Sequence, residues 1–383
     1  MTLTTLVPWP LLILPALAAW VGHACLWTYS LNNLYGRPLS KRFLKPFRLF
    51  VGAVIAGFPL LAWLAFASDA VLFYLAPCAL FGGLVFPLIT LKRLLRKPPA
   101  AVQRSTTRTL DLWKELGPKL VGNGRMPWAT RLPFTCAFRV DFTHTTLAVP
   151  KLPPAWDGLT VLLLSDFHFH GTPSEAYFQR VVDELLAGPT PDVVVLAGDY
   201  LDSHALHDWV PRVLGRLKWN ECGIAILGNH DGPYNPYRTR ELLAECGYHV
   251  VSDCWKEVSI RGVSTVVVGH EGPWFRRVPN LADAPNHFRL CVSHSPDQFY
   301  WAQANRIDLM FCGHVHGGQI RVPAIGSIFI PSVYSRRFDE GVFHENGTLM
   351  VVSRGLSGKE PLRFRCHPQA LTLTLRVETE ADA

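Results

Sequence analysis

Residues 162–170 read LLLSDFHFH, so a run of leucines passes without a break into Asp166, Phe167 and His168. The apolar run is too short for a core helix and is typical of a buried strand. Two later runs behave in the same way: VVVL at 193–196 leads into Gly198-Asp199, and IAIL at 224–227 leads into GNHD at 228–231. We therefore expect polar, metal-binding side chains to converge at the ends of neighbouring strands.

Two more polar clusters follow later strand-like runs, Ser293-His294 and Gly313-His314-Val315-His316. With the first three, they supply every ligand that a two-metal phosphoesterase site needs. One carboxylate can share its two oxygens between cations about 3.5–4 Å apart, and mixed oxygen and nitrogen ligands suit Mn, Fe or Zn better than Mg or Ca. The sequence thus predicts a centre for two divalent metal ions that needs no cysteine ligand.

Helix signals alternate with strand-like runs from Trp156 onward, which favours an α/β arrangement. Helices are predicted over three segments: 175–186 after Ser174, 236–247 from a proline, and 296–305 from a proline. From Ile320 onward, short strands with Pro and Gly turns predict β-structure, and Asn346-Gly347 is typical of a hairpin turn rather than of a glycosylation site. The fold class is therefore α/β with an α+β ending.

In their order, the motifs DxH, GDxxD, GNHD, a lone His and GHxH resemble the calcineurin-like metallophosphoesterase family over roughly residues 159–375. The tail at 317–323, with 352–356 and 361–364, is similar to the branch of membrane-associated bacterial phosphodiesterases related to UDP-2,3-diacylglucosamine hydrolases. The resemblance implies a four-layer αββα sandwich, in which two packed β-sheets are flanked by helices and the site lies at the carboxyl ends of strands.

The resemblance also implies the roles of individual residues. It assigns one metal to Asp166, His168, Asp199 and His316, and the second to Asp199, Asn229, His294 and His314, with Asp199 bridging. The resemblance implies that a hydroxide held between the metals would attack phosphorus in line. His230 is expected to act as an acid or oxyanion stabiliser, and Asp202 to orient it and raise its pKa. Asp231 is expected to have a structural, hydrogen-bonding role. Mn is the leading metal, with Fe, Zn or a mixture as alternatives.

The first third of the chain is typical of a membrane region. No Asp, Glu, Lys or Arg occurs from Leu6 to Leu31, and three transmembrane helices are predicted at about 6–31, 49–67 and 70–91. A cleaved signal peptide is the alternative for the first run, and a re-entrant hairpin or buried core helices are the alternative for the others. The domains expected are a transmembrane region at 1–97, a connector at 98–157 and a metallophosphoesterase domain at 158–383.

Basic residues predict the orientation. They crowd the loop between the first two spans and follow the third, at positions 37, 41, 42, 45 and 48 and at 92, 93, 96 and 97. By the positive-inside rule the N-terminus is outside and the catalytic domain is cytoplasmic, in a multi-pass protein of the cell inner membrane. Nine cysteines without a CxxC pair agree with this side, because they are typical of reduced thiols. Within the connector, we expect a helix around Thr109–Leu120 and a strand at Thr145–Val149.

Several residues near the motifs are weaker candidates. His170, His204 and His207 are solvated loop imidazoles or substrate contacts, and Gly269–Arg277 is a surface loop or a receiver of an acyl chain and a phosphate. Arg354 and Arg363 either clamp a phosphate or form ion pairs in the tail. The sequence leaves these alternatives open.

The function expected is a membrane-anchored phosphoesterase that hydrolyses a phosphodiester or pyrophosphate bond of a lipid-linked substrate, such as UDP-2,3-diacylglucosamine, at the cytoplasmic face. The alternatives are a membrane-tethered hydrolase of soluble or cyclic nucleotides and a non-catalytic membrane scaffold. The net charge of +7 comes largely from the juxtamembrane clusters, so lipid headgroups are expected as partners and nucleic acid is not. Protein phosphatase activity is disfavoured, because Ser203-His204 stands where those enzymes carry Arg-Gly. The oligomeric state stays open.

Overall fold

The computed structural model describes residues 9–64, 68–275 and 277–378, and by its internal contacts the chain falls into two units. The helical unit consists of Met1–Lys97 together with Val322–Ser335. The sheet unit consists of Pro98–Arg321 together with Arg336–Ala383. Residues 98–157, expected to be a connector, thus cluster with the sheet unit, and a later segment of the chain joins the helices.

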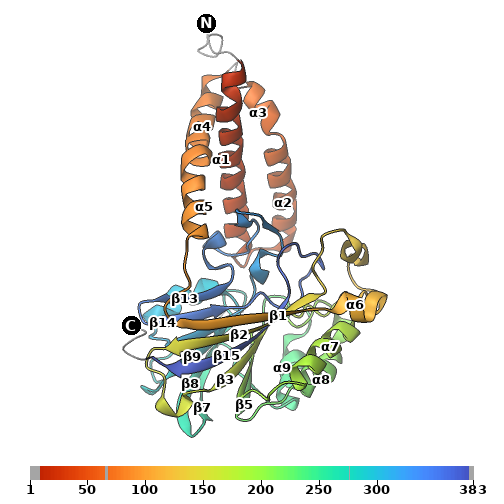
Figure 1. The fold of residues 1–383 in the computed structure, drawn as a ribbon, viewed down its shortest axis with the longest axis vertical. Helices are drawn as coiled ribbons and strands as arrows, with labels where there is room; N and C mark the ends of the chain where they lie inside the picture. Colours follow the sequence, from red (N-terminus) through yellow and green to blue (C-terminus); the bar gives the residue numbers. More distant parts are fainter. Residues whose placement is uncertain (1–8, 65–67, 276, 379–383) are drawn as a thin grey trace. The chain divides into compact units, whose positions relative to one another are not determined.

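Apolar helices make up most of the helical unit (Figure 1). They are α1 (Trp9–Tyr35), α2 (Lys41–Ala56), α3 (Phe58–Leu64), α4 (Asp69–Leu80), the π-helical turn η2 (Phe81–Val85) and α5 (Phe86–Leu94). Within the described residues, Leu12–Tyr35 and Asp69–Leu94 are long and apolar enough to cross a membrane. A third span exists only if α2 and α3, bent by 53°, are counted as one. The bend lies at Gly57 and Pro59, and proline lacks the N–H that a continuous helix needs.

Glycine and one buried histidine hold these helices together. A Cβ on Gly22 would lie 1.9 Å from the carbonyl oxygen of Cys78, and one on Gly82 would lie 2.0 Å from that of Ala18, so α1 packs backbone to backbone on α4 and η2. His23 is buried, with Nδ1 2.7 Å from the Tyr74 hydroxyl and Nε2 3.1 Å from the Val54 carbonyl oxygen. This ring therefore joins α1, α2 and α4.

The segment Val322–Ser335 is held against the end of α1. The buried amide of Asn32 donates to the Ile328 carbonyl at 3.0 Å and to the Ser335 hydroxyl at 2.9 Å, and its oxygen accepts from the Ile330 N–H at 3.1 Å. Asn33 donates to the Val333 carbonyl at 2.9 Å. No pattern in the sequence predicted this attachment.

Two large sheets form the core of the sheet unit in the described part of the chain. The seven-stranded sheet has the order β1-β2-β15-β3-β4-β5-β6, and the six-stranded sheet has the order β13-β14-β10-β9-β8-β7. The first contains β1 (Val102–Asp111), β2 (Arg139–Val149), β3 (Thr160–Leu164), β4 (Val193–Leu196), β5 (Cys222–Ala225), β6 (Tyr248–Val250) and β15 (Gln369–Val377). The second contains β7 (Cys254–Ile260), β8 (Val263–His270), β9 (Arg289–Ser293), β10 (Leu309–Cys312), β13 (Gly341–Glu345) and β14 (Thr348–Val352), while β11 (Arg321–Val322) and β12 (Gly326–Ser327) are short.

The two sheets pack face to face, and helices cover the seven-stranded sheet. Strands of both sheets share one apolar core, with Val195, Ile224, Val292 and Phe311 fully buried in it. A second core joins the seven-stranded sheet to α7 (Glu175–Leu186), α8 (Trp209–Val213) and α9 (Pro236–Glu245), which lie together on one side of it in Figure 1. Two shorter helices are α6 (Leu112–Leu116) and α10 (Phe299–Ala304). The mixed α/β class expected from the sequence is confirmed.

Several local predictions are confirmed and one is wrong. Helix α7 has the predicted bounds, and Asn346 and Gly347, with φ of 50° and 77°, form the turn between antiparallel β13 and β14. The helix expected around Thr109–Leu120 is wrong in its first part, because β1 continues to Asp111. Hydroxyl pairs across β1 and β2, such as Ser105 with Thr145 at 2.9 Å, favour the strand there.

Candidate metal centre

Seven polar side chains meet where five buried strands end. Asp166 and His168 follow β3, Asp199 follows β4, Asn229 follows β5, His294 follows β9, and His314 and His316 follow β10. Among the described residues, five of these candidates have left-handed backbone: φ is 56° at Asp166, 48° at His168, 59° at Asp199, 71° at His314 and 51° at His316. Each such residue costs on the order of 1–3 kcal/mol, and such strain is typical of functional sites.

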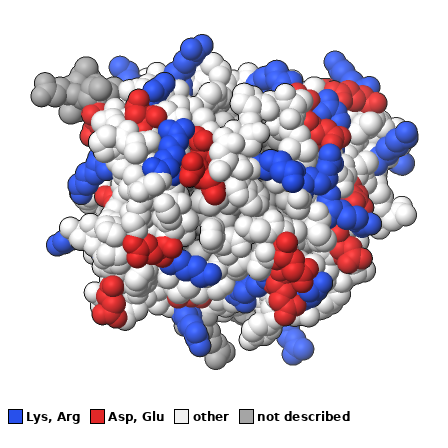
Figure 2. Space-filling view, turned by 90° about the horizontal axis from the view of Figure 1, so that it is seen from below, with Lys and Arg blue, Asp and Glu red and all other residues white. Residues whose placement is uncertain are grey.

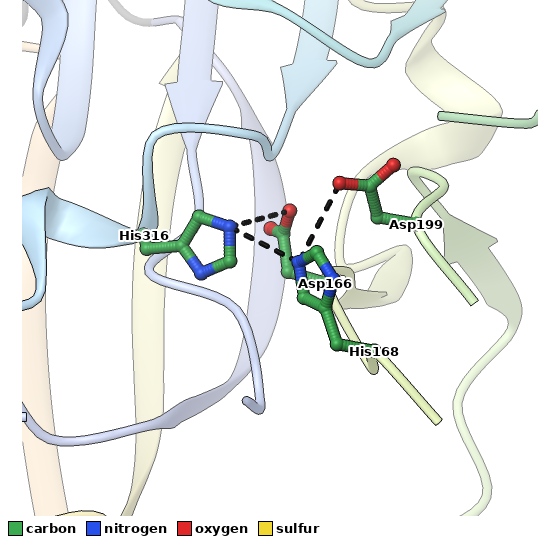
Figure 3. Close-up of side chains that lie close together, drawn as sticks. All are labelled: Asp166, His168, Asp199 and His316. Atoms are coloured by element: carbon green, nitrogen blue, oxygen red, sulfur yellow. Dashed lines mark hydrogen bonds and ion pairs between the residues drawn. The ribbon is translucent and has the colours of Figure 1, made fainter. Parts of the chain in front are cut away.

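The first group consists of Asp166, His168, Asp199 and His316, whose ligand atoms all lie within 4.8 Å of one another (Figure 3). The Nδ1 of His168 donates to Asp202 at 2.9 Å, and the Nδ1 of His316 donates to the Ser357 carbonyl at 3.0 Å. The two Nε2 atoms lie 3.2 Å apart, and Nε2 of His168 also lies 3.5 Å from Oδ2 of Asp199. Burial acts to lower the pKa of His168, but the nearby carboxylates, Asp202 first, raise it. A divalent cation would replace the proton between the rings and would be bound by both Nε2 atoms.

The second group consists of Asp199, His294 and His314, and Asn229 lies beside it. The Nδ1 of His294 donates to the Ala197 carbonyl at 2.7 Å, and its Nε2 lies 3.1 Å from the Asn229 amide oxygen and 3.3 Å from Asp199 Oδ1. Burial acts to lower the pKa of His294, but Asp199 and Asp166 raise that pKa to about 9, so the ring is protonated without metal. A divalent cation would replace the Nε2 proton and would be bound by this nitrogen together with the two oxygens.

Asp199 is common to both groups and is the clearest evidence for metal. Its Oδ1 accepts the His230 N–H at 2.8 Å, whereas its Oδ2, in the described structure, is buried without a hydrogen-bond partner. A buried carboxylate oxygen left in this state is costly unless a cation satisfies it. Burial acts to raise the pKa of Asp199, but His294 and His230 hold that pKa well below its ordinary value. The residues present therefore fit divalent metal.

Asp202 joins the first group to His230. One oxygen of Asp202 accepts from His168 and the other lies 2.5 Å from Nδ1 of His230. Burial opposes ionisation of Asp202, but these two bonds hold its pKa below the ordinary value. The expected orientation of His230 by Asp202 is present, and Asp202 acts to raise the pKa of His230 as expected, but the net direction is the opposite. Burial lowers the pKa of His230, and the nearby carboxylates of Asp199 and Asp202 do not offset it.

Two buried acids fix the loops that carry these side chains. Asp231 accepts from four backbone N–H groups, those of Asp199, Tyr200, Leu201 and Gly228, at 2.8–3.0 Å, which is the structural role expected for it. Glu271 accepts the Leu227 N–H at 2.8 Å and pairs with Arg240, so it positions the start of the GNHD loop. We did not predict this role for Glu271; its place directly after the strand-like run 263–270 was the available signal.

The two tail arginines bind protein groups. Arg363 is fully buried and donates to backbone carbonyls, including those of His316, Arg354 and Ser357. Arg354 pairs with Asp141 at 2.7 Å. These contacts favour a structural role over a phosphate clamp, since both guanidiniums are engaged within the tail and its neighbours.

His170, His204 and His207 belong to none of the groups of candidate ligands found among the described residues. His170 is buried and accepts the Arg125 N–H at 3.1 Å, while His207 lies 2.8 Å from the Tyr234 carbonyl and near His204. In the segment 269–277, the Trp274 ring packs on His314 at 4.5 Å and on His294 at 5.8 Å. Arg276 lies outside the described residues.

Comparisons with known proteins agree with this geometry. Residues 159–318 match the family model of the calcineurin-like phosphoesterases. The chain is 29% identical over 225 residues to Phosphodiesterase YaeI of Escherichia coli, covering 56% of this chain and 81% of that protein. It is 22% identical over 299 residues to UDP-2,3-diacylglucosamine pyrophosphatase LpxG of Chlamydia trachomatis, covering 60% and 87%. It is 36% identical over 210 residues to a transmembrane protein with metallophosphoesterase domain of Danio rerio, covering 45% and 44%.

Proposed function

We propose, from the premise that this chain carries a calcineurin-like metallophosphoesterase domain and is a metal-dependent phosphoester hydrolase, that it acts on a lipid-linked phosphodiester or pyrophosphate. The observation that carries a two-metal site is Asp199, which is shared by two groups of ligands and keeps one buried oxygen without a hydrogen bond in the described structure. That oxygen is where a second cation gains a ligand at no cost to an existing hydrogen bond.

We assign the ligands in two sets. Asp166, His168, Asp199 and His316 hold one cation, and Asp199, Asn229, His294 and His314 hold the other, with Mn as the leading metal. When bound, such a pair of cations supplies a nucleophile at neutral pH and offsets negative charge on the phosphoryl oxygens. His168 and His316 are already fixed for this task, because their Nδ1 atoms are bonded to Asp202 and the Ser357 carbonyl.

His230 is the residue that we assign to the substrate rather than to metal. Asp202 engages its Nδ1, which leaves Nε2 for a phosphoryl oxygen or the leaving-group oxygen. Its backbone N–H donates to Asp199, so the ring and the shared carboxylate keep a fixed separation. Asp202 is a positioning residue that aligns His168 and His230 together.

The lipid-linked substrate is supported by the helical unit and by the relatives. Two apolar helices of the described chain are long enough to span a membrane, and one relative is named as a pyrophosphatase of UDP-2,3-diacylglucosamine. We place the site at the cytoplasmic face of the inner membrane, with the bent pair α2 and α3 as a third span. Lys41, Arg42, Lys92 and Arg93, at the ends of the apolar helices, support this orientation.

The test is Mn-dependent release of UMP from UDP-2,3-diacylglucosamine by the full chain in detergent. UDP-N-acetylglucosamine, which lacks the two long acyl chains, is the matched soluble substrate, and bis-p-nitrophenyl phosphate is the generic diester. Asp199→Asn is the blank. Release from the lipid alone supports the proposal. Equal turnover of UDP-N-acetylglucosamine favours a hydrolase of soluble nucleotides. Cleavage of bis-p-nitrophenyl phosphate alone would show that the lipid-linked uridine compound is not the substrate.

A further inference from the structure

A short loop of the sheet unit exposes apolar and cationic side chains together. We call residues 125–134 the rim loop. Its exposed fractions are 58% at Trp128, 39% at Leu132 and 79% at Phe134, and Arg125 and Arg131 are exposed beside them. Large side chains are rarely grouped in this way on a water-facing surface without a partner.

Basic residues outnumber acidic ones in the sequence around the rim loop. Residues 116–140 contain Lys119, Arg125, Arg131 and Arg139 but no Asp or Glu, and of these Arg139 pairs with Asp111 at 3.3 Å. By contrast, basic and acidic side chains are interspersed over the face that Figure 2 shows. A segment with Trp, Phe, Leu and Arg and without acids is typical of proteins that rest in the headgroup region of a bilayer.

The first end of the rim loop is tied to the DxH motif. The Arg125 N–H donates to His170 at 3.1 Å, and the Gly124 N–H donates to Thr172 at 2.9 Å. A Cβ on Gly124 would lie 2.2 Å from the His170 carbonyl oxygen, so the two backbones touch there. His170 is two residues from the candidate ligand His168.

The other end is tied to the GHxH motif. The Cys136 N–H donates to the Arg363 carbonyl at 2.8 Å, and the Arg363 guanidinium in turn donates to the His316 carbonyl. The rim loop is therefore bonded, directly or through Arg363, to the loops that carry two candidate ligands of the first metal.

Backbone strain within the rim loop accompanies the exposure. Met126 and Phe134 have φ of 46° and 75°, although neither is glycine. The strained backbone presents the Phe134 ring outward, with an edge contact to Phe364 at 6.5 Å between ring centres. A strained backbone that exposes an apolar ring to solvent does not stabilise the fold. Such a conformation therefore points to a ligand that contacts the ring.

We propose that the rim loop enters the headgroup region of an anionic lipid bilayer and receives the lipid-linked substrate there. The bilayer is the partner because the same chain carries apolar helices long enough to cross one, and because the exposed Arg125 and Arg131 match anionic headgroups. Contact with the bilayer is inferred from the side chains of the loop and does not depend on the proposed function. Delivery of the substrate does rest on the proposed function.

The first experiment measures bilayer contact without activity. An environment-sensitive fluorescent amino acid replaces Trp128 in the full chain, which is placed in lipid nanodiscs that hold one copy each. We expect quenching by acyl-chain nitroxide lipids, and more of it with phosphatidylglycerol than with phosphatidylcholine alone. The same probe at Leu186, which is 41% exposed on α7, is the control and should be quenched by aqueous iodide instead. Quenching by iodide at both positions in nanodiscs would overturn the proposal. If the probe at position 128 becomes buried only when several copies of the protein are present together, the loop serves self-association and the proposal fails.

The second experiment measures substrate delivery. We expect the double variant Trp128→Ser and Phe134→Ser to raise KM for a lipid-linked substrate about tenfold and to change its kcat little, since a tenfold effect corresponds to about 1.4 kcal/mol of lost contact. Leu186→Ser should leave KM unchanged. An unchanged KM in the double variant would overturn delivery. If the unaltered chain fails to cleave the lipid, the proposed substrate fails, and the fluorescence result still decides whether the loop meets the bilayer.

Discussion

Buried polar side chains that join elements of the helical unit differ in state from those at the metal centre of the sheet unit. In the helical unit, Asn32 has a partner for its oxygen and two for its amide nitrogen, and both ring nitrogens of His23 have partners. In the sheet unit, Asp199 keeps an oxygen without a hydrogen bond in the described structure, 3.5 Å from Nε2 of His168, and the Nε2 atoms of His168 and His316 face each other. Satisfied groups hold a structure together, whereas unsatisfied groups that converge mark the place of a ligand.

The substitution expected to have the largest effect is Asp199→Asn, which changes the shared carboxylate of the metal centre. An amide offers one oxygen and no charge, so it can serve at most one cation and no longer bridges two, and we expect turnover to fall about a thousandfold or more. Metal content by mass spectrometry should fall with it, while the unfolding midpoint of the metal-free protein changes little. Asp183→Asn, on the surface of α7, is the matched control. Retained turnover would show that Asp199 does not bridge metals.

His230→Ala separates substrate chemistry from metal binding. We expect turnover to fall about 10²- to 10⁴-fold, the usual contribution of a positioned acid or base. Metal content should stay at the level of the unaltered protein, because the ring belongs to neither assigned ligand set. Equal metal loss in this variant and in Asp199→Asn would refute that division of roles.

Asn32→Leu tests the hydrogen-bonded polar groups of the helical unit. The substitution leaves the Ile330 N–H and the Ile328 carbonyl without their side-chain partner, and each such loss costs about 1–3 kcal/mol. We expect a lower unfolding midpoint in detergent and faster proteolysis within 322–335, with metal content unchanged. Asn33→Leu removes the bond to Val333 and should show a smaller effect. No change in either variant would mean that these amides do not hold the segment.

The smallest effect concerns pH and Asp141. Burial opposes its ionisation, but His367, Thr109 and Arg354 lower its pKa in the folded state. The stabilisation is therefore present above the unfolded-state pKa of about 3.9 and is lost as the pH falls through the folded-state pKa. Asp141→Asn should lower the unfolding midpoint at pH 7 and reduce the difference between pH 7 and pH 3. If the difference in unfolding midpoint between pH 7 and pH 3 stays the same in the variant, the loss of stability at low pH comes from other carboxylates.

The sequence predicted features that depend on neighbouring residues. Short-range sequence patterns predict three features that the structure has: the buried strands that end in Asp or His, the helix at 175–186 and the Asn346-Gly347 turn. It did not predict that Val322–Ser335 attaches to α1, because bonds such as Asn32 with Ser335 join residues about 300 positions apart. The pKa of His230 was misjudged for a similar reason, since its burial depends on tertiary packing.

The left-handed backbone at Asp166, His168, Asp199, His314 and His316 limits how such a centre can be copied. Asn, Asp and His tolerate this conformation better than most residues other than glycine, and β-branched residues tolerate it badly. Chemistry and backbone therefore select the same residue types at these positions. An engineer who grafted the seven side chains onto straight strand ends of another scaffold would transfer the donor atoms and still fail to bring them together.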